Sequence, residues 1–280
     1  MQFDNFFYRA MMMSEGWQFN SKRDCTLLAL SPPNAKIDQW QLNLPAGYTC
    51  PFASDCRANA NKYTGKIEEP KKGDEGFRCY AASQEAIYPK TRASRHNNFD
   101  LLLSKKTQEE ITQLIIDSLE NQLPRNQRIF RIHSSGDFFS QKYFNAWVEV
   151  ANHFSDIIFY AYTKSLPYWI RRKKELPSNM ILTASKGGKD DKDIDLHDLK
   201  FSAVVFSEKD AEEYPLSPYW QKTLGRTKGL PLDHDDTHAF RDGNPFALLL
   251  HGIQPKGTKA GEAFRALAGS SGYSKKSKDN

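Results

Sequence analysis

Three of the four cysteines in this 280-residue chain fall within a single stretch, residues 44–80. Cys50, Cys56 and Cys79 follow one another as Cys-x5-Cys-x22-Cys, in a segment rich in Gly, Pro and polar residues. Thiolates are soft ligands, and several of them in one loop-rich segment are typical of a site that holds a metal or a cluster. The pattern therefore predicts an inorganic centre held by these three cysteines.

The spacing favours an iron–sulfur cluster over other metal sites. It lacks the paired Cys-x2-Cys of a zinc ribbon. It also differs from the Cys-x3-Cys-x2-Cys common in enzymes that cleave S-adenosylmethionine. Three thiolates would leave one iron of a [4Fe–4S] cluster open to a substrate or cofactor. Cys25 is a candidate fourth ligand, although a small buried or free thiol is the favoured interpretation.

Two alternatives stay open at this stage. In the first, Zn²⁺ held by Cys50, Cys56, Cys79 and either Cys25 or His96 stabilises a nucleic-acid-binding module without catalysis. In the second, the run 233–236 (Asp-His-Asp-Asp) with His238 binds a divalent ion. Runs of Asp and His are common in exposed loops, which favours a purely local role for this one.

The elements that must position the cysteines alternate between strands and helices. Thr107 and Glu110 form a capping box that begins a helix, and Pro124 ends it. Strands are predicted at 40–44, 128–133, 157–162, 180–184, 201–206 and 245–251, and helices at 81–88, 140–154, 168–176 and 261–267. Strand–helix–strand units of this length imply a parallel sheet. We expect an α/β fold in which repeated strand–helix units form a parallel sheet, with a partial (β/α) barrel as one form of it, and a loop-rich N-terminal cysteine segment.

The remaining segments set the expected domain organisation. Residues 64–76 and 207–244 are rich in charge, Gly and Pro, and they are predicted to be irregular. Residues 1–268 are predicted to form a single metal-binding domain, and the low-complexity residues 269–280 a disordered tail.

Sites on parallel sheets form where strands end, and four such ends carry polar groups. They are the turns 133–137, 163–165, 185–188 and 251–252. Asp137 and His133 are the acid/base candidates, and Lys164 is the third catalytic candidate. The candidates for binding substrate are Arg92, Arg95, Asn97, Ser135, Gly136, Thr163, Ser165, Ser185, Lys186 and His251. The cations would attract an anion, the hydroxyls would donate hydrogen bonds, and the glycines would let the backbone approach a ligand.

The composition adds a mild preference for anionic partners. Lys and Arg number 39 against 34 Asp and Glu, so the formal net charge is +5. This excess permits an anionic small molecule or nucleic acid but requires neither. The N-terminus lacks the features of a signal peptide, and no apolar run reaches the roughly 20 residues that span a bilayer. We therefore expect a soluble intracellular protein with no membrane partner, whose cysteines are not disulfides.

Several motifs together resemble the phage gene product 88 family. They are residues 44–51 (LPAGYTCP) with Cys56, residues 79–81 (CYA), Arg95-x-Asn97, residues 131–138 (RIHSSGDF), residues 162–165 (YTKS) and residues 184–185 (AS). The resemblance covers about residues 40–206 and implies a phage or prophage protein in the cytoplasm of the infected bacterial host. The layout is also similar to phage proteins that resemble radical S-adenosylmethionine enzymes. That likeness maps the cluster ligands to the same three cysteines and adds S-adenosylmethionine as a candidate cofactor.

These observations together predict an iron–sulfur enzyme that acts on an anionic small molecule, such as a nucleotide or a phosphorylated metabolite. Radical chemistry, Lewis-acid chemistry at an open iron and hydrolysis are the reaction classes considered.

Overall fold

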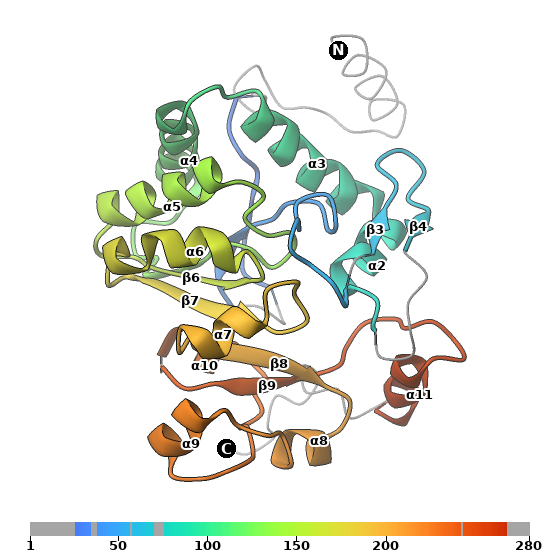
Figure 1. The fold of residues 1–280 in the computed structure, drawn as a ribbon. Helices are drawn as coiled ribbons and strands as arrows, with labels where there is room; N and C mark the ends of the chain where they lie inside the picture. The colour runs from blue at the N-terminus through green and yellow to red at the C-terminus, as the bar shows by residue number, and fades with distance from the viewer. Residues whose placement is uncertain (1–25, 35–37, 57, 70–75, 242, 268–280) are drawn as a thin grey trace.

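A seven-stranded open sheet forms the centre of the computed structural model, in the order β1-β2-β5-β6-β7-β8-β9 (Figure 1). The structure describes residues 26–34, 38–56, 58–69, 76–241 and 243–267. β1 (Leu30–Ser31) pairs antiparallel with β2 (Trp40–Leu42), and every other neighbouring pair is parallel. The other strands are β5 (Ile129–Arg131), β6 (Ile158–Thr163), β7 (Met180–Ser185), β8 (Phe201–Val205) and β9 (Phe246–Leu249).

The predicted α/β class is confirmed, since the mostly parallel strands alternate with helices. The predicted strands at 40–44, 128–133, 157–162, 180–184, 201–206 and 245–251 all occur, with ends shifted by a few residues. The sheet has two edges, β1 and β9, so it is not a closed barrel. The partial barrel and the single domain over 1–268 stay predictions.

One face of the sheet carries the main core. Phe159 and Ala161 of β6 are buried there with Trp147. Three helices lie along this part of the sheet: α4 (Gln108–Gln122), α5 (Gln141–His153) and α6 (Leu166–Arg172), which a short 3-10 turn at Lys173–Glu175 extends (Figure 1). The predicted capping box of α4 is present, with Thr107 and Glu110 each bonding the other's backbone. Each large apolar side chain buried here contributes roughly 1.5–3 kcal/mol.

The opposite face packs against a segment that the sequence did not mark as helical. Tyr160 of β6 points to this face, and its ring lies 5.3 Å from that of Phe240 in α10 (Thr237–Arg241). The prediction that 207–244 is irregular is therefore wrong, because α8 (Glu208–Glu212), α9 (Pro218–Leu224) and α10 lie within it. Helices of five to seven residues are too short to show a 3.6-residue periodicity.

The segments around the cysteines form a separate layer at one end of the sheet. It contains α2 (Tyr80–Ile87), α3 (Pro89–Leu103) and the hairpin of β3 (Asn59–Ala60) with β4 (Ile67–Glu68) (Figure 1). The helix predicted at 81–88 is confirmed as α2. Part of the predicted loop 64–76 is instead strand β4. The polar segment around Arg92–Asn98 is the middle of α3, which the sequence analysis did not identify because its buried face is polar.

Two further helices complete the described fold, α7 (Lys192–Leu196) and α11 (Lys259–Ala266), the second of which confirms the helix predicted at 261–267. The predicted tail 269–280 and Cys25 lie outside the described residues. Within the ranges described here, no helix combines the length and apolar character needed to cross a bilayer.

Candidate functional site

The loop that carries Cys50 starts at the carboxyl end of β2 and is held by its own backbone. Thr49 Oγ1 donates to the Pro45 carbonyl at 2.8 Å, and the Cys50 amide donates to the Gly47 carbonyl at 3.3 Å. Gly47 has a φ of +74°, and a Cβ there would lie 2.9 Å from the Ala58 carbonyl oxygen. Only glycine accommodates this turn without strain. The loop therefore returns tightly over the end of the sheet.

The segment that leads to Cys56 packs against the turn after β7. The amides of Ser54 and Asp55 both donate to the Gly187 carbonyl at 3.0 Å. Gly187 has a φ of +93°, and a Cβ there would lie 2.7 Å from a carboxylate oxygen of Asp55. The glycines predicted to let backbone approach a ligand thus let the cysteine loop approach the sheet.

Cys79 occupies the N-cap position of α2. The backbone amides of Ala82 and Ala81, in the first turn of the helix, interact with its sulfur and act to lower its pKa. Amides at a helix N-terminus stabilise negative charge, so this position suits a thiolate. Burial dominates, however, and together with the charge of Cys56 it raises the pKa of Cys79 to about 11.

The other two predicted ligands lie near enough to Cys50 for their charges to affect the pKa of its thiol. Burial raises the pKa of the Cys50 thiol well above its ordinary value, and the charges of Asp137, Cys79 and Cys56 raise it further. All three thiols are half-buried and none is in a disulfide. Among the described residues, no three His, Cys, Asp or Glu side chains are arranged closely enough to hold a single metal ion. In the part of the chain that the structure describes, these thiols therefore do not form a site for a single ion.

Asp137, the first acid/base candidate, lies beside this thiol group in the turn after β5. It is 5% exposed, and its carboxylate accepts from Thr163 Oγ1 at 2.6 Å and from the amides of Phe138 and Lys164 at 2.7 and 2.8 Å. Burial raises its pKa to about 6, although these hydrogen bonds act to lower it. The carboxyl group is therefore held in one orientation and can carry a proton near neutral pH.

Lys164 joins two of the predicted turns. Its Nζ donates to Ser185 Oγ and the Ser185 carbonyl, both at 2.9 Å, and to the Lys186 carbonyl at 2.6 Å. Ser165 Oγ donates to the Phe138 carbonyl at 2.7 Å. Lys164, Thr163, Ser165 and Ser185 thus lie together as predicted, but their polar atoms bind protein groups.

The turn after β5 lies directly against the Cys50 loop. The Leu44 amide donates to the Ser135 carbonyl at 2.9 Å, and Ser135 Oγ donates to the Leu44 carbonyl at 2.8 Å. Gly136 has a φ of +84°, and a Cβ there would lie 2.5 Å from Thr49 Oγ1. The contacts of Ser135 and Gly136 therefore hold the turn after β5 against the Cys50 loop.

His133, the second acid/base candidate, faces the core instead. It is 2% exposed, its Nε2 lies 3.0 Å from the Tyr143 hydroxyl, and its ring contacts Phe138. Burial and the neighbouring charge of Arg131 lower its pKa to about 3. An enclosed, neutral imidazole in an aromatic cluster supports packing rather than proton transfer.

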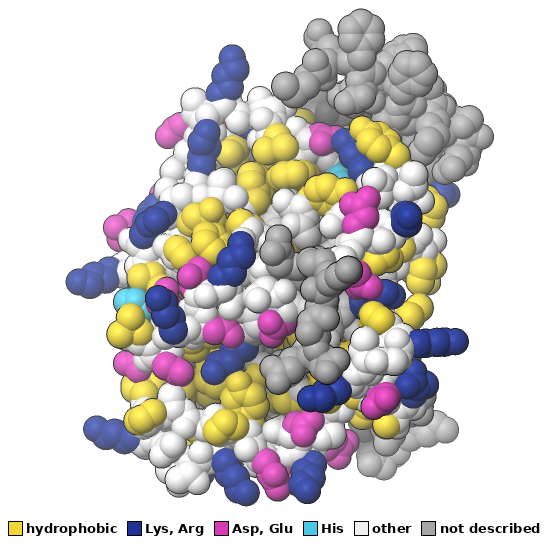
Figure 2. Space-filling model, turned by 45° about the vertical axis from the view of Figure 1, so that its right-hand side comes forward, with side chains coloured by type: hydrophobic (Ala, Val, Ile, Leu, Met, Phe, Trp, Pro, Cys, Tyr) yellow, Lys and Arg dark blue, Asp and Glu magenta, His cyan; other side chains and the backbone are white. Residues whose placement is uncertain are grey.

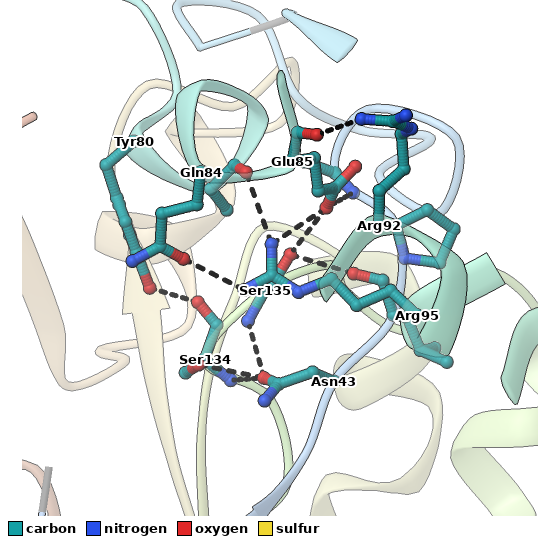
Figure 3. A network of polar contacts seen from close by, with 12 residues as sticks. Asn43, Tyr80, Gln84, Glu85, Arg92, Arg95, Ser134 and Ser135 are labelled. Atoms are coloured by element: carbon teal, nitrogen blue, oxygen red, sulfur yellow. Dashed lines mark hydrogen bonds and ion pairs between the residues drawn. The ribbon is translucent and has the colours of Figure 1, made fainter. Parts of the chain in front are cut away.

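The basic residues of α3 are buried against α2. Arg92 donates to the Glu85 and Lys62 carbonyls at 2.6 and 3.1 Å. Arg95 pairs with the Glu85 carboxylate at 2.9 Å (Figure 3). Asn97 is exposed, whereas its neighbour Asn98 is buried and bonds the backbone of Asn43, just after β2, and of Ala29, just before β1.

The last two candidates, Lys186 and His251, follow β7 and β9. Lys186 Nζ sits 4.7 Å from the centre of the Phe201 ring and 5.7 Å from that of Tyr214. His251 is half-buried, and its ring lies 4.6 Å from that of Tyr80, the residue after Cys79. His251 is thus near the cysteine segment, although it follows the last strand.

Residues of the acidic run 233–236 bond to other protein groups. Asp233 accepts from the amides of Asp235 and His238 at 3.1 and 3.0 Å, and Asp236 pairs with buried Arg131 at 2.6 Å. This arrangement agrees with the local role favoured from the sequence.

Two buried polar residues that join the segments of the site were not identified from the sequence: Asn43 and Glu85. Asn43 Oδ1 accepts from the amides of Ser134 and Ser135 (Figure 3), so it joins the ends of β2 and β5. Its polar side chain near the end of the strand predicted at 40–44 was the one available signal. Glu85 lies in a short polar helix and gives none.

The face shown in Figure 2 bears on the nucleic-acid alternative. Among the described residues of this face, basic and acidic side chains are interspersed rather than gathered into a basic patch. This distribution agrees with the mild net charge of +5.

The comparisons with known proteins identify the family. A family model described as "Gene product 88" matches residues 16–269. This chain belongs to the gene product 88 family. Two relatives are the Gene 88 proteins of Mycobacterium phage D29, 28% identical, and Mycobacterium phage L5, 27% identical, each over 129 residues. These matches cover 44% of this chain and 46% of each relative, so the chain spans about half the length of the curated relatives it matches.

The phage origin expected from the sequence agrees with these matches, and the resemblance to the gene product 88 family is confirmed. No solved structure matches the chain. The similarity to radical S-adenosylmethionine proteins receives no support from them.

Proposed function

We propose that this gene product 88 protein is an enzyme that holds a [4Fe–4S] cluster on Cys50, Cys56 and Cys79 and acts on a small molecule in the cytoplasm of the infected host. One observation carries the proposal: Cys50 and Cys56 lie on a loop that packs against the turns after β5 and β7, and Cys79 begins α2, which is bonded to the turn after β5. Parallel sheets form their active sites at this carboxyl edge.

The donor set fits a cluster. Burial raises the pKa of Cys50 and of Cys79, so these thiols are unfavourable as thiolates unless a positive centre offsets their charge, which iron would do. Cys79 also occupies the N-cap of α2, where backbone amides stabilise negative charge as the hydrogen bonds to cluster sulfurs do. In a cluster each thiolate binds a different iron, so the sulfurs lie further apart than around one ion. The sequence spacing Cys-x5-Cys-x22-Cys also lacks the paired Cys-x2-Cys of a zinc ribbon, which favours a cluster over zinc.

A cluster with one iron left open by the protein would supply a Lewis-acidic or electron-donating centre at this edge. Asp137 is the group we propose for moving a proton beside it, since three hydrogen bonds fix its orientation. Lys164 has a positioning role, because its three contacts hold the turn after β7 against the turn after β6.

The proposed substrate is an anionic small molecule. Arg92 and Arg95 are committed to protein acceptors, so recognition of the anion would fall to Lys186, His251 and backbone amides. S-adenosylmethionine is retained as a cofactor to be tested.

Anaerobic purification tests the cluster directly. The protein should be brown, absorb broadly at roughly 400 nm, and contain about four irons with matching sulfide. Cys56→Ala should lose the iron, whereas Cys25→Ala should keep it. A colourless protein with one zinc would replace the proposal with the structural zinc alternative, and a protein without metal would overturn both.

The variant Asp137→Asn tests whether this carboxyl group is needed for turnover but not for binding iron. This variant should keep the iron and lose ligand binding or turnover, because only the ionisable group changes. Unchanged turnover would remove Asp137 from the mechanism.

A further inference from the structure

A single carboxylate oxygen joins the segments that carry the thiols. Glu85 in α2 is fully buried, and its Oε1 accepts from the Ala46 amide at 3.0 Å, from Arg95 at 2.9 Å and from Ser135 Oγ at 3.3 Å (Figure 3). Ala46 lies in the loop that leads to Cys50. One atom of α2 thus contacts a loop, a helix and a strand-end turn.

Each of these contacts lies a few residues from a proposed site residue. Glu85 follows Cys79 by six positions in the same helical segment, about 9 Å along the axis. Ser135 is two residues before Asp137. The helix is a rigid connection, so holding Glu85 also holds its first turn.

The start of α2 is fastened to the same neighbours. The Tyr80 hydroxyl donates to the Ser134 carbonyl, and Arg95 donates to the Ala81 carbonyl at 3.2 Å and to Gln84 Oε1 at 2.9 Å (Figure 3). Both turns of α2 are therefore tied to the turn after β5 and to α3. Among the described residues, Glu85 makes the hydrogen bond from α2 to the Cys50 loop, beside the apolar packing of Ala81 and Ala82 against Ala46.

The buried ion pair of Glu85 and Arg95 is not arranged to add much stability. Burial raises the pKa of Glu85 even though Arg95 opposes the shift. Glu85 Oε2 and Arg95 Nε are buried without a hydrogen-bond partner in the described part of the chain. A buried ion pair with unmet hydrogen bonds is often less stabilising than an apolar pair of the same volume, so its presence favours a specific positional role.

We infer that Glu85 is a positioning residue that sets the place of Cys79 relative to Cys50, through Ala46 and Ser135. This inference rests on the proposed function only for its consequence, cluster assembly. The geometric part holds for the metal-free protein and is tested separately.

The test measures the distance between Cys50 and Cys79 without metal. In a Cys25→Ala, Cys56→Ala background these are the two remaining thiols, and bifunctional maleimides of graded length report the shortest spacer that joins them. Glu85→Ala should lower the yield with that spacer several-fold, because α2 is released from the loop. Glu85→Gln should preserve the yield of the folded protein, since its amide oxygen can accept the same bonds, although its stability should fall because Arg95 loses its counter-charge.

A matched control separates positioning from general destabilisation. Asn179 is half-buried just before β7, and its Nδ2 donates to three carbonyls, at the edge of the sheet away from the thiols. Asn179→Ala should lower stability but leave the cross-linking yield unchanged. If Glu85→Ala does not fold, Ser135→Ala removes one of the three contacts and should reduce the yield partially.

Iron content gives the second readout, measured with all four cysteines present. Glu85→Ala should lower the iron per chain, and Glu85→Gln should restore it. Wild-type cross-linking yield in folded Glu85→Ala would overturn the inference. Absence of iron from the wild-type protein would overturn the proposed cluster and leave the cross-linking result to decide the positioning role.

Discussion

Asp236 and Arg131 form a buried ion pair whose disruption should cost a large part of the stability of the fold. Arg131 Nη1 lies 2.6 Å from Asp236 Oδ2, and the two side chains are 10% and 4% exposed. Tyr160 and Tyr162 also donate their hydroxyls to Asp236, at 3.0 and 2.8 Å. The pair connects the segment before α10 to β5 and β6.

Asp236→Asn removes the charge with little change in shape. Asp236 has a φ of +64°, a conformation that Asn tolerates better than other non-glycine residues, so backbone strain is not added. The guanidinium of Arg131 is left buried without its counter-charge, which costs about 3–5 kcal/mol. Against a typical total of roughly 5–15 kcal/mol, this loss is easily measured.

Urea unfolding followed by tryptophan fluorescence gives the free energy of each variant. Asp198→Asn is the matched control, since Asp198 is exposed and also has a positive φ, of +51°. We expect this control to change stability by less than about 0.5 kcal/mol. In an Arg131→Met background the Asp236 carboxylate is the charge left unpaired, so Asp236→Asn should restore part of the stability instead of lowering it.

Two results would refute this reasoning. One is a loss below about 1 kcal/mol for Asp236→Asn, which would mean that water reaches the guanidinium. The other is a double variant whose loss equals the sum of the two single losses, which would show that the charges are not coupled.

Two further predictions follow from the packing and titration of single residues. Gly136→Ala should destabilise the protein by more than the roughly 1–3 kcal/mol of a strained backbone, because its Cβ would also meet Thr49 Oγ1 at 2.5 Å. Gly225→Ala, with a φ of +65° and nothing within 4 Å, isolates the backbone cost in the same denaturation assay, and equal losses would contradict the steric argument. Burial lowers the pKa of His96 to about 3, so the folded state resists its protonation and stability should fall as the pH drops from 6.5 towards 3, by about 1.4 kcal/mol per pH unit. His96→Gln should flatten the pH dependence of the urea midpoint over this window, and an unchanged slope would show that the ring takes up its proton in the folded state.

The repeating elements were predictable because their signals are local. The capping box of Thr107 and Glu110 and the apolar spacing of α4 and α5 depend on neighbours within a few residues. Prediction failed where a helix was too short to show a periodicity, or where the buried face of a helix is polar. The polar inner face of α3, with Arg92 and Arg95, reads as a surface segment until Glu85 and backbone carbonyls are seen to satisfy it.

Residue types alone identified the cysteines, Asp137 and the strand-end turns as candidates, since thiols and carboxylates after predicted strands are informative without coordinates. Which candidates face one another was a tertiary outcome. His133 and Asp137 are four residues apart in one turn, yet His133 enters the aromatic core and Asp137 lies beside Cys50. Gly136 lies between them with a positive φ, so the chain changes direction before it reaches Asp137.

By itself, then, the sequence determined the α/β class, the order of the main helices and strands, and the set of reactive groups. Only the tertiary structure decided that Lys164 and Arg95 bind protein acceptors and that Glu85 joins α2 to the Cys50 loop. The reason is physical: helix and strand signals arise from contacts a few residues apart, whereas these pairings join residues 10 to 39 positions apart along the chain, as the hydrogen bonds of Arg95 to Glu85 and of Ala46 to Glu85 show.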